Sequence, residues 1–200
     1  MNADPRLVGA ILRSDFYSFI RAIFPIVSPS SPFAPNWHIE TIAFALTRVL
    51  RGEIKRLIIT VPPRSLKSIC ASVAFPAFVL GHDPTRRIIC VSYAEALARK
   101  HANDCRALMR SPLYHRLFPN TRISNAKDTE LEFATTVGGN RLATSIGGTL
   151  TGRGGTSSSS TTRSSHRTPT RKPPAKIPSS GIPTRCSAAS MTRPRTPSSW

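Results

Sequence analysis

The chain has 200 residues, and 28 Lys and Arg against 10 Asp and Glu give it a formal net charge of +18. This length is enough for one domain with a buried core, and the strong positive charge predicts a polyanionic partner, nucleic acid first. The four cysteines form no CxxC pair and no Cys/His cluster, which argues against a thiolate metal site. The apolar run 7–27 is interrupted by Arg13, Asp15 and Arg21, so we do not expect it to cross a membrane.

The distribution of charge changes at Gly155. Every Asp and Glu precedes this residue, whereas the segment 156–200 carries only Lys and Arg among Ser, Thr and Pro. Such a segment buries too little apolar surface to offset the entropy lost on ordering. We therefore predict an N-terminal helical segment over 1–35, a folded domain over 36–155, and a disordered basic tail over 156–200.

The beginning of the chain predicts two helices. Residues 6–24 form an amphipathic pattern that we expect Pro25 to end. Asn36 is a capping residue for a second helix, which we expect to stop at Gly52. The apolar positions of this second helix fall on one face: Ile39, Ile42, Ala43, Leu46, Val49 and Leu50.

The rest of the folded region alternates predicted strands with predicted helices. Strands are expected at 56–61, 86–93, 130–136 and 141–146, the last two joined by a turn at Gly138-Gly139. Helices are expected at 69–80, apolar all round with Pro76 as a kink, and at 94–110. This alternation predicts a parallel sheet of the α/β class.

The segment "TVPPRSLKS", residues 60–68, lies where a predicted strand meets a predicted helix. A phosphate-binding loop needs backbone N–H groups and a helix N-terminus facing the anion. It also needs a Lys for the β- and γ-phosphates and a Ser or Thr for Mg²⁺, roles that Lys67 and Ser68 fill. Val61 and Leu66 replace the two glycines of the usual G-x-x-x-x-G-K-[ST] pattern. The alternative interpretation is a polar turn that precedes a helix.

Residues 14–155 resemble the N-terminal ATPase region of the large terminase subunit of tailed bacteriophages. The matching motifs occur in the same order along the chain: "PPRSLKS" in the phosphate loop, "SYAEALA", "SPLY" and "GGTLTGRGG". The resemblance implies a motor that uses ATP to drive double-stranded DNA into a viral capsid. It also implies a nuclease domain further along, the small terminase subunit and the portal as partners, and the cytoplasm of a host bacterium as location, with a phage or prophage gene.

The resemblance also implies a P-loop NTPase-type parallel sheet with flanking helices, incomplete here, with 36–155 as a partial ATPase domain. It assigns Lys67 to the ATP phosphates, Ser68 to Mg²⁺ and Arg64 to a catalytic role as sensor or charge stabiliser near the γ-phosphate. For Arg64 a surface cation beside a helix start is the alternative. The residues expected to line the ATP site are Pro63, Arg64, Ser65, Leu66, Lys67 and Ser68. Trp37 and His38 are candidates for adenine contact, although packing of a helix N-terminus is the favoured interpretation.

A P-loop ATPase also needs a buried apolar strand that ends in an Asp for the Mg²⁺ shell, followed by an acid that activates water. In the terminase family this motif follows "TGRGG" closely, but here the segment 156–162 reads "TSSSSTT". Read one base earlier, Ser codons of the form TCN become Phe, Leu, Ile or Val, and Thr codons become Tyr, His, Asn or Asp. The shifted frame therefore permits Asp, four apolar residues and Asp-Asp. We predict that 156–200 is the frameshifted product of a terminase gene.

Two other functions remain open from the sequence. A helicase-like ATPase shares the phosphate loop but needs later motifs of its own. A non-enzymatic nucleic-acid binder would use the basic tail as a genuine part of the protein. As the 200 residues stand, we expect ATP binding with little or no hydrolysis, because the acidic motif and the nuclease domain are missing from them.

Overall fold

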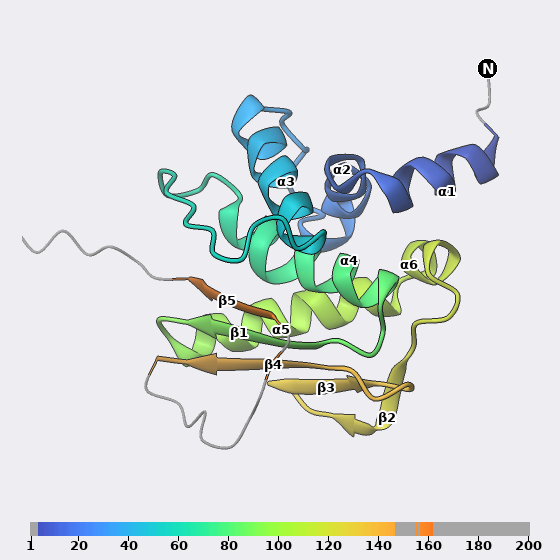
Figure 1. Cartoon of the computed structure of the whole chain (residues 1–200), viewed down its shortest axis with the longest axis vertical. Helices are drawn as coiled ribbons and strands as arrows, with labels where there is room; N and C mark the ends of the chain where they lie inside the picture. The colour runs from blue at the N-terminus through green and yellow to red at the C-terminus, as the bar shows by residue number, and fades with distance from the viewer. Residues whose placement is uncertain (1–3, 147–154, 156, 162–200) are drawn as a thin grey trace, which may run out of the picture. The chain divides into compact units, whose positions relative to one another are not determined.

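The computed structural model of the chain describes residues 4–146, 155 and 157–161 (Figure 1). The chain divides into two compact units, Met1–Ser164 and Ser165–Trp200, and all described residues belong to the first. The predicted glycine-rich loop before Gly155 and the predicted tail beyond residue 161 lie outside the described residues. In the ranges described, no helix combines the length and the apolar character that crossing a membrane requires.

Two helices replace the single one predicted over 6–24. They are α1 (Pro5–Ser14) and α2 (Phe16–Val27), separated at Asp15, whose φ of −113° leaves the helical region. The carboxylate of Asp15 accepts a hydrogen bond from the Ser18 N–H at 2.8 Å and so caps α2. The prediction that Pro25 ends the helix is wrong, because Pro25 lies in the last turn of α2, where it removes few helical hydrogen bonds.

The second predicted helix is confirmed as α3 (Trp37–Leu50), with Ile39, Ile42, Ala43 and Leu46 buried. Asn36 precedes it, but its side chain makes no capping hydrogen bond. Gly52 follows the helix with a φ of +78°, and its N–H donates to the Val49 carbonyl at 3.0 Å. This left-handed position after a helix is the one that glycine takes at lowest cost.

The sheet has five strands in the order β2-β3-β4-β1-β5. Their bounds are β1 Arg87–Ser92, β2 Ile123–Asp128, β3 Glu132–Thr135, β4 Asn140–Ser145 and β5 Ser157–Thr161. β1 pairs in parallel with β4 and β5, whereas β3 pairs antiparallel with β4 and with β2. The predicted all-parallel sheet is thus corrected to a mixed one. The predicted turn at Gly138-Gly139 lies between β3 and β4, and a tight hairpin joins strands that run in opposite directions. This hairpin makes the sheet mixed.

The helices cover one face of this sheet. η1 (Ile69–Ala74), α4 (Phe75–His82), α5 (Glu95–Arg110) and α6 (Pro112–Leu117) follow one another along the chain. α5 packs on β4 and β1, η1 packs on β5, and α5 and η1 pack on each other. The strand residues buried beneath them are Ile88, Cys90, Ser92, Phe133, Arg141 and Ala143. Figure 1 shows no helix on the opposite face within the described part of the chain.

An aromatic cluster forms the centre of the helical layer. The Phe78 ring centroid in α4 lies 5.0 Å from that of Phe16 and 5.1 Å from that of Phe19, both in α2. Phe118, which follows α6, lies 6.1 Å from Phe19 and 6.3 Å from Phe78. These contacts join the N-terminal helices to α4 and α6, so the segment 1–35 shares its core with the rest of the unit.

The strand predicted over 56–61 is not present. Leu57, Ile59 and Val61 pack against the core, and Ile58 is 90% exposed, so burial alternates as in a strand. No strand within the described residues pairs with this segment, however, and a strand is stabilised by the backbone hydrogen bonds of a neighbour. The sequence pattern therefore predicted which side chains turn inward but not the pairing.

The apolar helix predicted over 69–80 is confirmed, as η1 followed directly by α4. Pro76 lies at the start of α4 and has no N–H to give to the Ser72 carbonyl four residues earlier. The guanidinium of Arg141, from β4, donates to that carbonyl at 2.9 Å through Nη2. A side chain of the sheet thus bonds to a carbonyl for which Pro76 provides no donor.

β5 is the largest departure from the predicted organisation. We expected disorder from residue 156, but residues 157–161 form a strand parallel to β1. Its sequence is Ser-Ser-Ser-Ser-Thr, whereas strands beside a parallel neighbour are usually rich in Val, Ile and Leu. The Oγ atom of Ser159 is buried and has no hydrogen-bond partner among the described residues. An unpaired buried hydroxyl costs about 1–3 kcal/mol, so serine fits this position poorly.

A buried histidine in α5 makes the stability of the fold depend on pH. His101 is 6% exposed, and burial, together with the nearby Arg141 cation, lowers its pKa to about 4. The ordinary histidine pKa is about 6.5, so between these values the unfolded chain binds a proton that the folded chain does not. Stability should therefore be full above pH 6.5 and fall by up to about 3 kcal/mol as the pH drops towards 4.

The test is a series of melting temperatures for the chain and for His101→Gln between pH 7 and pH 4. The variant should lose stability less steeply over this range, because Gln does not titrate. Equal slopes for the two proteins would show that His101 is not held neutral by the fold.

Candidate functional site

The predicted site residues lie together on the loop that leads into η1. Pro63, Arg64, Ser65, Leu66, Lys67 and Ser68 are consecutive, and helical backbone begins at Lys67. The Cys70 N–H donates to the Leu66 carbonyl at 2.9 Å, which closes the first turn. Ser68 occupies the N-cap position of η1, and its side chain makes no capping hydrogen bond.

The backbone of this loop adopts the left-handed conformation twice. Arg64 has a φ of 65° and Leu66 a φ of 55°, and they are the only non-glycine residues with positive φ among those described. Residues that alternate between left- and right-handed backbone turn successive N–H groups towards one concave side, and this arrangement binds anions. The conformation costs a non-glycine residue about 1–2 kcal/mol, so the surrounding structure must impose it.

Leu66 takes the backbone conformation that a glycine usually provides at this point of the motif. Its side chain is half-buried and packs against the hydrophobic core. The leucine side chain therefore lies on the protein side of the loop. The sequence left open whether a side chain fits there, and the structure accommodates it by burying it.

The cations of the loop have no acidic partner. None of the ion pairs within the described residues involves Arg64 or Lys67. Arg64 is exposed and Lys67 is half-buried beside the helix start. The helix N-terminus adds a partial positive charge of its own. The loop thus combines two unpaired cations, a helix N-terminus and a left-handed backbone, which together favour a bound phosphate group.

The loop offers a cation hydroxyl ligands, with Ser68 at the helix start as the one that the motif assigns to Mg²⁺. In the part of the chain that the structure describes, no three His, Cys, Asp or Glu side chains lie close enough to hold a metal ion. No Asp or Glu follows Glu132 in the sequence. Among the described residues, the donors of the loop therefore suit a phosphate group that brings its own Mg²⁺.

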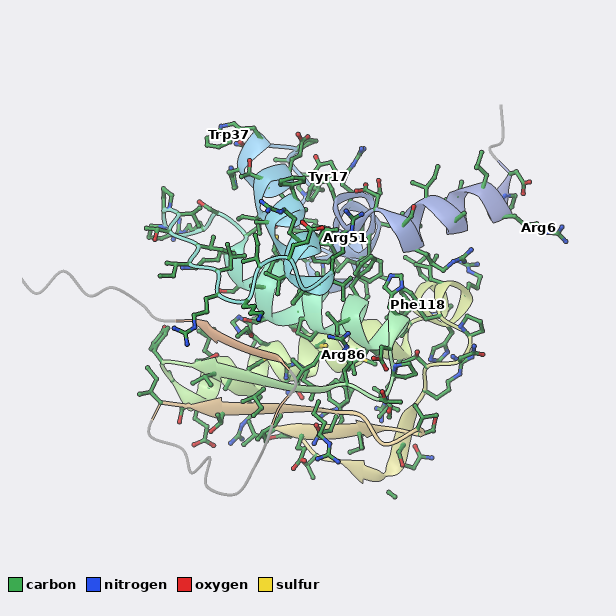
Figure 2. All side chains as sticks on the ribbon, in the orientation of Figure 1. Arg6, Tyr17, Trp37, Arg51, Arg86 and Phe118 are labelled. Carbon is green, nitrogen blue, oxygen red and sulfur yellow. The ribbon has the colours of Figure 1, made fainter. Side chains whose placement is uncertain are left out.

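Trp37 is positioned differently from the favoured expectation, whereas His38 is half-buried. Trp37 is 75% exposed, and Figure 2 shows it at the end of α3 that is farther from the sheet. Its ring centroid lies 6.3 Å from that of His38. Trp37 therefore does not pack the helix start, and that interpretation is wrong for it. Arg153, in the predicted glycine-rich loop, lies outside the described residues.

Sequence reasoning overlooked Arg141, the one fully buried Arg among the residues described. It is 0% exposed and bonds to the helix that follows the candidate loop. The only signal was its position in "NRLATS", where alternation places residue 141 on the same face as Ala143. An Arg at an inward-facing strand position indicates a buried polar contact.

Comparison with protein families, with curated proteins and with solved structures found no match to this chain. The chemistry of the loop is therefore inferred from its residues and its geometry alone.

The left-handed backbone at Arg64 gives a direct test of the loop conformation. Arg64 is exposed, so its replacement changes little packing. Arg64→Gly should be about 0.5–1 kcal/mol more stable than Arg64→Ala, because only glycine adopts positive φ without strain. Chemical denaturation measures both variants, and each loses the same charge.

The matched control is the same pair of substitutions at Arg56, an exposed residue without positive φ. There Ala should be the more stable residue, because glycine loses more entropy on folding. If Ala is also the more stable at position 64, the loop does not have the backbone described above.

Proposed function

We propose that this chain is the nucleotide-binding part of a phage DNA-packaging ATPase, a terminase large subunit, in which the residues after Gly155 are read out of frame. The left-handed loop at Arg64 and Leu66, with Lys67 and Ser68 at the start of a buried helix, is the observation that carries the proposal. ATP with Mg²⁺ is the proposed ligand. Double-stranded DNA, the small terminase subunit and the portal are the proposed partners.

The position of the loop relative to the sheet supports nucleotide binding. Figure 1 shows the segment before η1 on the side towards which the arrowheads of β1, β4 and β5 point. The helix η1–α4 runs back across the sheet and leads into β1, so its N-terminus lies at the carboxyl ends of the parallel strands. Ligands of open α/β sheets bind at that edge.

β5 supports the reading-frame part of the proposal. A strand paired in parallel with β1 is where an apolar, β-branched sequence is expected, and the shifted frame permits four apolar residues in this segment. The serine actually present at 159 leaves a buried hydroxyl without a partner in the described structure. The strand position thus fits the residues of the shifted frame better than those of the chain as it is read.

The residues of the loop would act on ATP mainly by binding and orienting its phosphates. Lys67 and the backbone N–H groups would neutralise the β- and γ-phosphates, and Ser68 would supply one Mg²⁺ ligand. Arg64 would stabilise charge near the γ-phosphate. Bound ATP would supply the free energy of phosphoryl transfer, but the chain has no Asp or Glu beyond Glu132 to complete the Mg²⁺ shell or activate water. Binding without appreciable turnover follows.

The positive charge supports the proposed nucleic-acid partner. Lys and Arg exceed Asp and Glu both before Gly155 and after it, and eight of the 28 cations lie after it. A chain with this excess binds DNA phosphates without sequence preference and in a salt-dependent way. The same charge also fits the second candidate, a non-enzymatic nucleic-acid binder, which would need no phosphate loop.

Binding of a fluorescent, non-hydrolysable ATP analogue tests the proposed function. Lys67→Ala should weaken binding at least about tenfold, because a cation at the phosphates is lost from a partly desolvated loop. Lys55→Ala removes the same charge from an exposed position outside the loop and should leave binding nearly unchanged.

Both variants lose one positive charge, so the nonspecific attraction of ATP to the basic chain falls equally in both. The difference between their affinities therefore reports the contribution of Lys67 in the loop. Equal affinities for Lys67→Ala and Lys55→Ala would contradict a nucleotide site at this loop. Steady hydrolysis of ATP by the 200-residue chain would contradict the claim that it lacks the acidic residues needed for turnover.

A further inference from the structure

One side of α3 carries two exposed aromatic rings. Trp37 is 75% exposed and Phe44 is 66% exposed. The buried face of the helix, on the opposite side, holds Ile39, Ile42, Ala43 and Leu46. With about 3.6 residues per turn, positions 37 and 44 fall on the same side of the helix and about 10 Å apart along its axis. Exposed apolar side chains that gather on one surface, rather than singly, are typical of a binding site for a partner.

The same side of the helix continues into cations. Arg48 is four residues after Phe44, and its guanidinium lies 5.9 Å from the centre of the Phe44 ring. Arg51 follows at the end of the helix. Glu53 pairs with both arginines, at 2.9 and 4.0 Å, but residues 37–67 still carry six Lys and Arg against two Glu. The surface therefore combines aromatic rings with an excess of positive charge.

Two further cations follow the helix closely. The N–H groups of Glu53 and Ile54 donate to the Arg48 carbonyl at 3.0 and 3.4 Å, so the chain stays beside the end of α3. Lys55 and Arg56 come next, and both are exposed. Neither forms an ion pair within the described residues, so their charge is available to an anionic ligand.

The spacing of the two rings restricts the ligand. A single adenine ring cannot cover both, because two helical turns separate them. A duplex does not fit either, because its bases are stacked on one another and present only their edges in the grooves. Unpaired bases present flat faces that stack on aromatic side chains, while Lys and Arg hold the phosphates between them. An extended run of unpaired nucleotides matches both the spacing and the charge.

We propose that the side of α3 formed by Trp37, Phe44 and Arg48 binds single-stranded nucleic acid. Bases stack on the rings of Trp37 and Phe44, and the cations Arg48, Lys55 and Arg56 hold the phosphates. This goes beyond the proposed function, in which the nucleic-acid partner is double-stranded DNA. It uses neither ATP nor the reading frame after Gly155, so the two proposals fail separately.

The affinities of the full chain for single strands and for duplexes test this surface. Trp37→Ala combined with Phe44→Ala should weaken binding of oligo(dT) and oligo(U) at least about fivefold, because stacking on the rings is lost. Binding of duplex DNA of the same length should stay nearly unchanged. A raised salt concentration limits the attraction of phosphates to the rest of the basic chain. The single strand that loses more affinity, DNA or RNA, is the ligand of this surface.

Ile58→Ala is the matched control. It removes an apolar side chain that is 90% exposed and lies outside α3, and it should leave both affinities unchanged. Trp37→Phe combined with Phe44→Tyr keeps both rings and should retain most of the single-strand affinity.

The fluorescence of Trp37 gives a second readout that needs no substitution in α3. The chain has two tryptophans, so Trp200→Phe leaves Trp37 as the only one. Oligo(dT) should quench its emission by stacking, and the duplex should leave it nearly unchanged. Absence of quenching by the single strand, or equal losses of affinity for single strand and duplex, would overturn the proposal. Unchanged single-strand binding in the double alanine variant would also overturn it, and is the result expected if a protein occupies this surface.

Discussion

The hydrogen bond from Arg141 to the Ser72 carbonyl joins the two layers of this fold at the point that positions the candidate site. Its ends are 69 residues apart in the chain. Pro76 provides no N–H for that carbonyl, and the sheet supplies a donor from the side. Because η1 begins at the candidate loop, a strand residue far along the chain helps to fix where Lys67 and Ser68 lie over the sheet. The apolar contacts around Phe78 hold the same helix without fixing its register so strictly.

The loop that this helix follows is conformationally strained. Two left-handed, non-glycine residues within three positions cost about 1–2 kcal/mol each, and Leu66 packs against the hydrophobic core. Strain of this kind is commonly found where a backbone must present its N–H groups to a ligand. A loop without glycines thus adopts two left-handed positions here, and the side chain at the second of them, Leu66, is packed against the core.

Much of the fold could be predicted from periodicity and turn residues. The buried face of α3, the apolar helix at 69–80, the helix at 94–110 and the hairpin at Gly138 all follow from local patterns. The break at Asp15 and the absence of a strand at 56–61 could not, because both depend on what the rest of the chain offers as partners. The consecutive residues of the candidate loop were predictable as a motif. The buried Arg141 was not, because its role depends on the carbonyl beside Pro76, in an element remote in sequence.

The residues of β5 do not suit its place in the sheet, and this mismatch is what connects the structure to the proposed change of reading frame. Its place in the sheet calls for apolar side chains, while its sequence supplies hydroxyls. The decisive measurement is the sequence of the DNA that encodes residues 154–200. The account predicts TCN codons for the four serines at 157–160. It also predicts that the frame one base earlier opens with Asp, an aliphatic run and Asp-Asp, and continues without a stop to the Trp200 codon. Serines encoded by AGC or AGT, or an early stop in that frame, would contradict it.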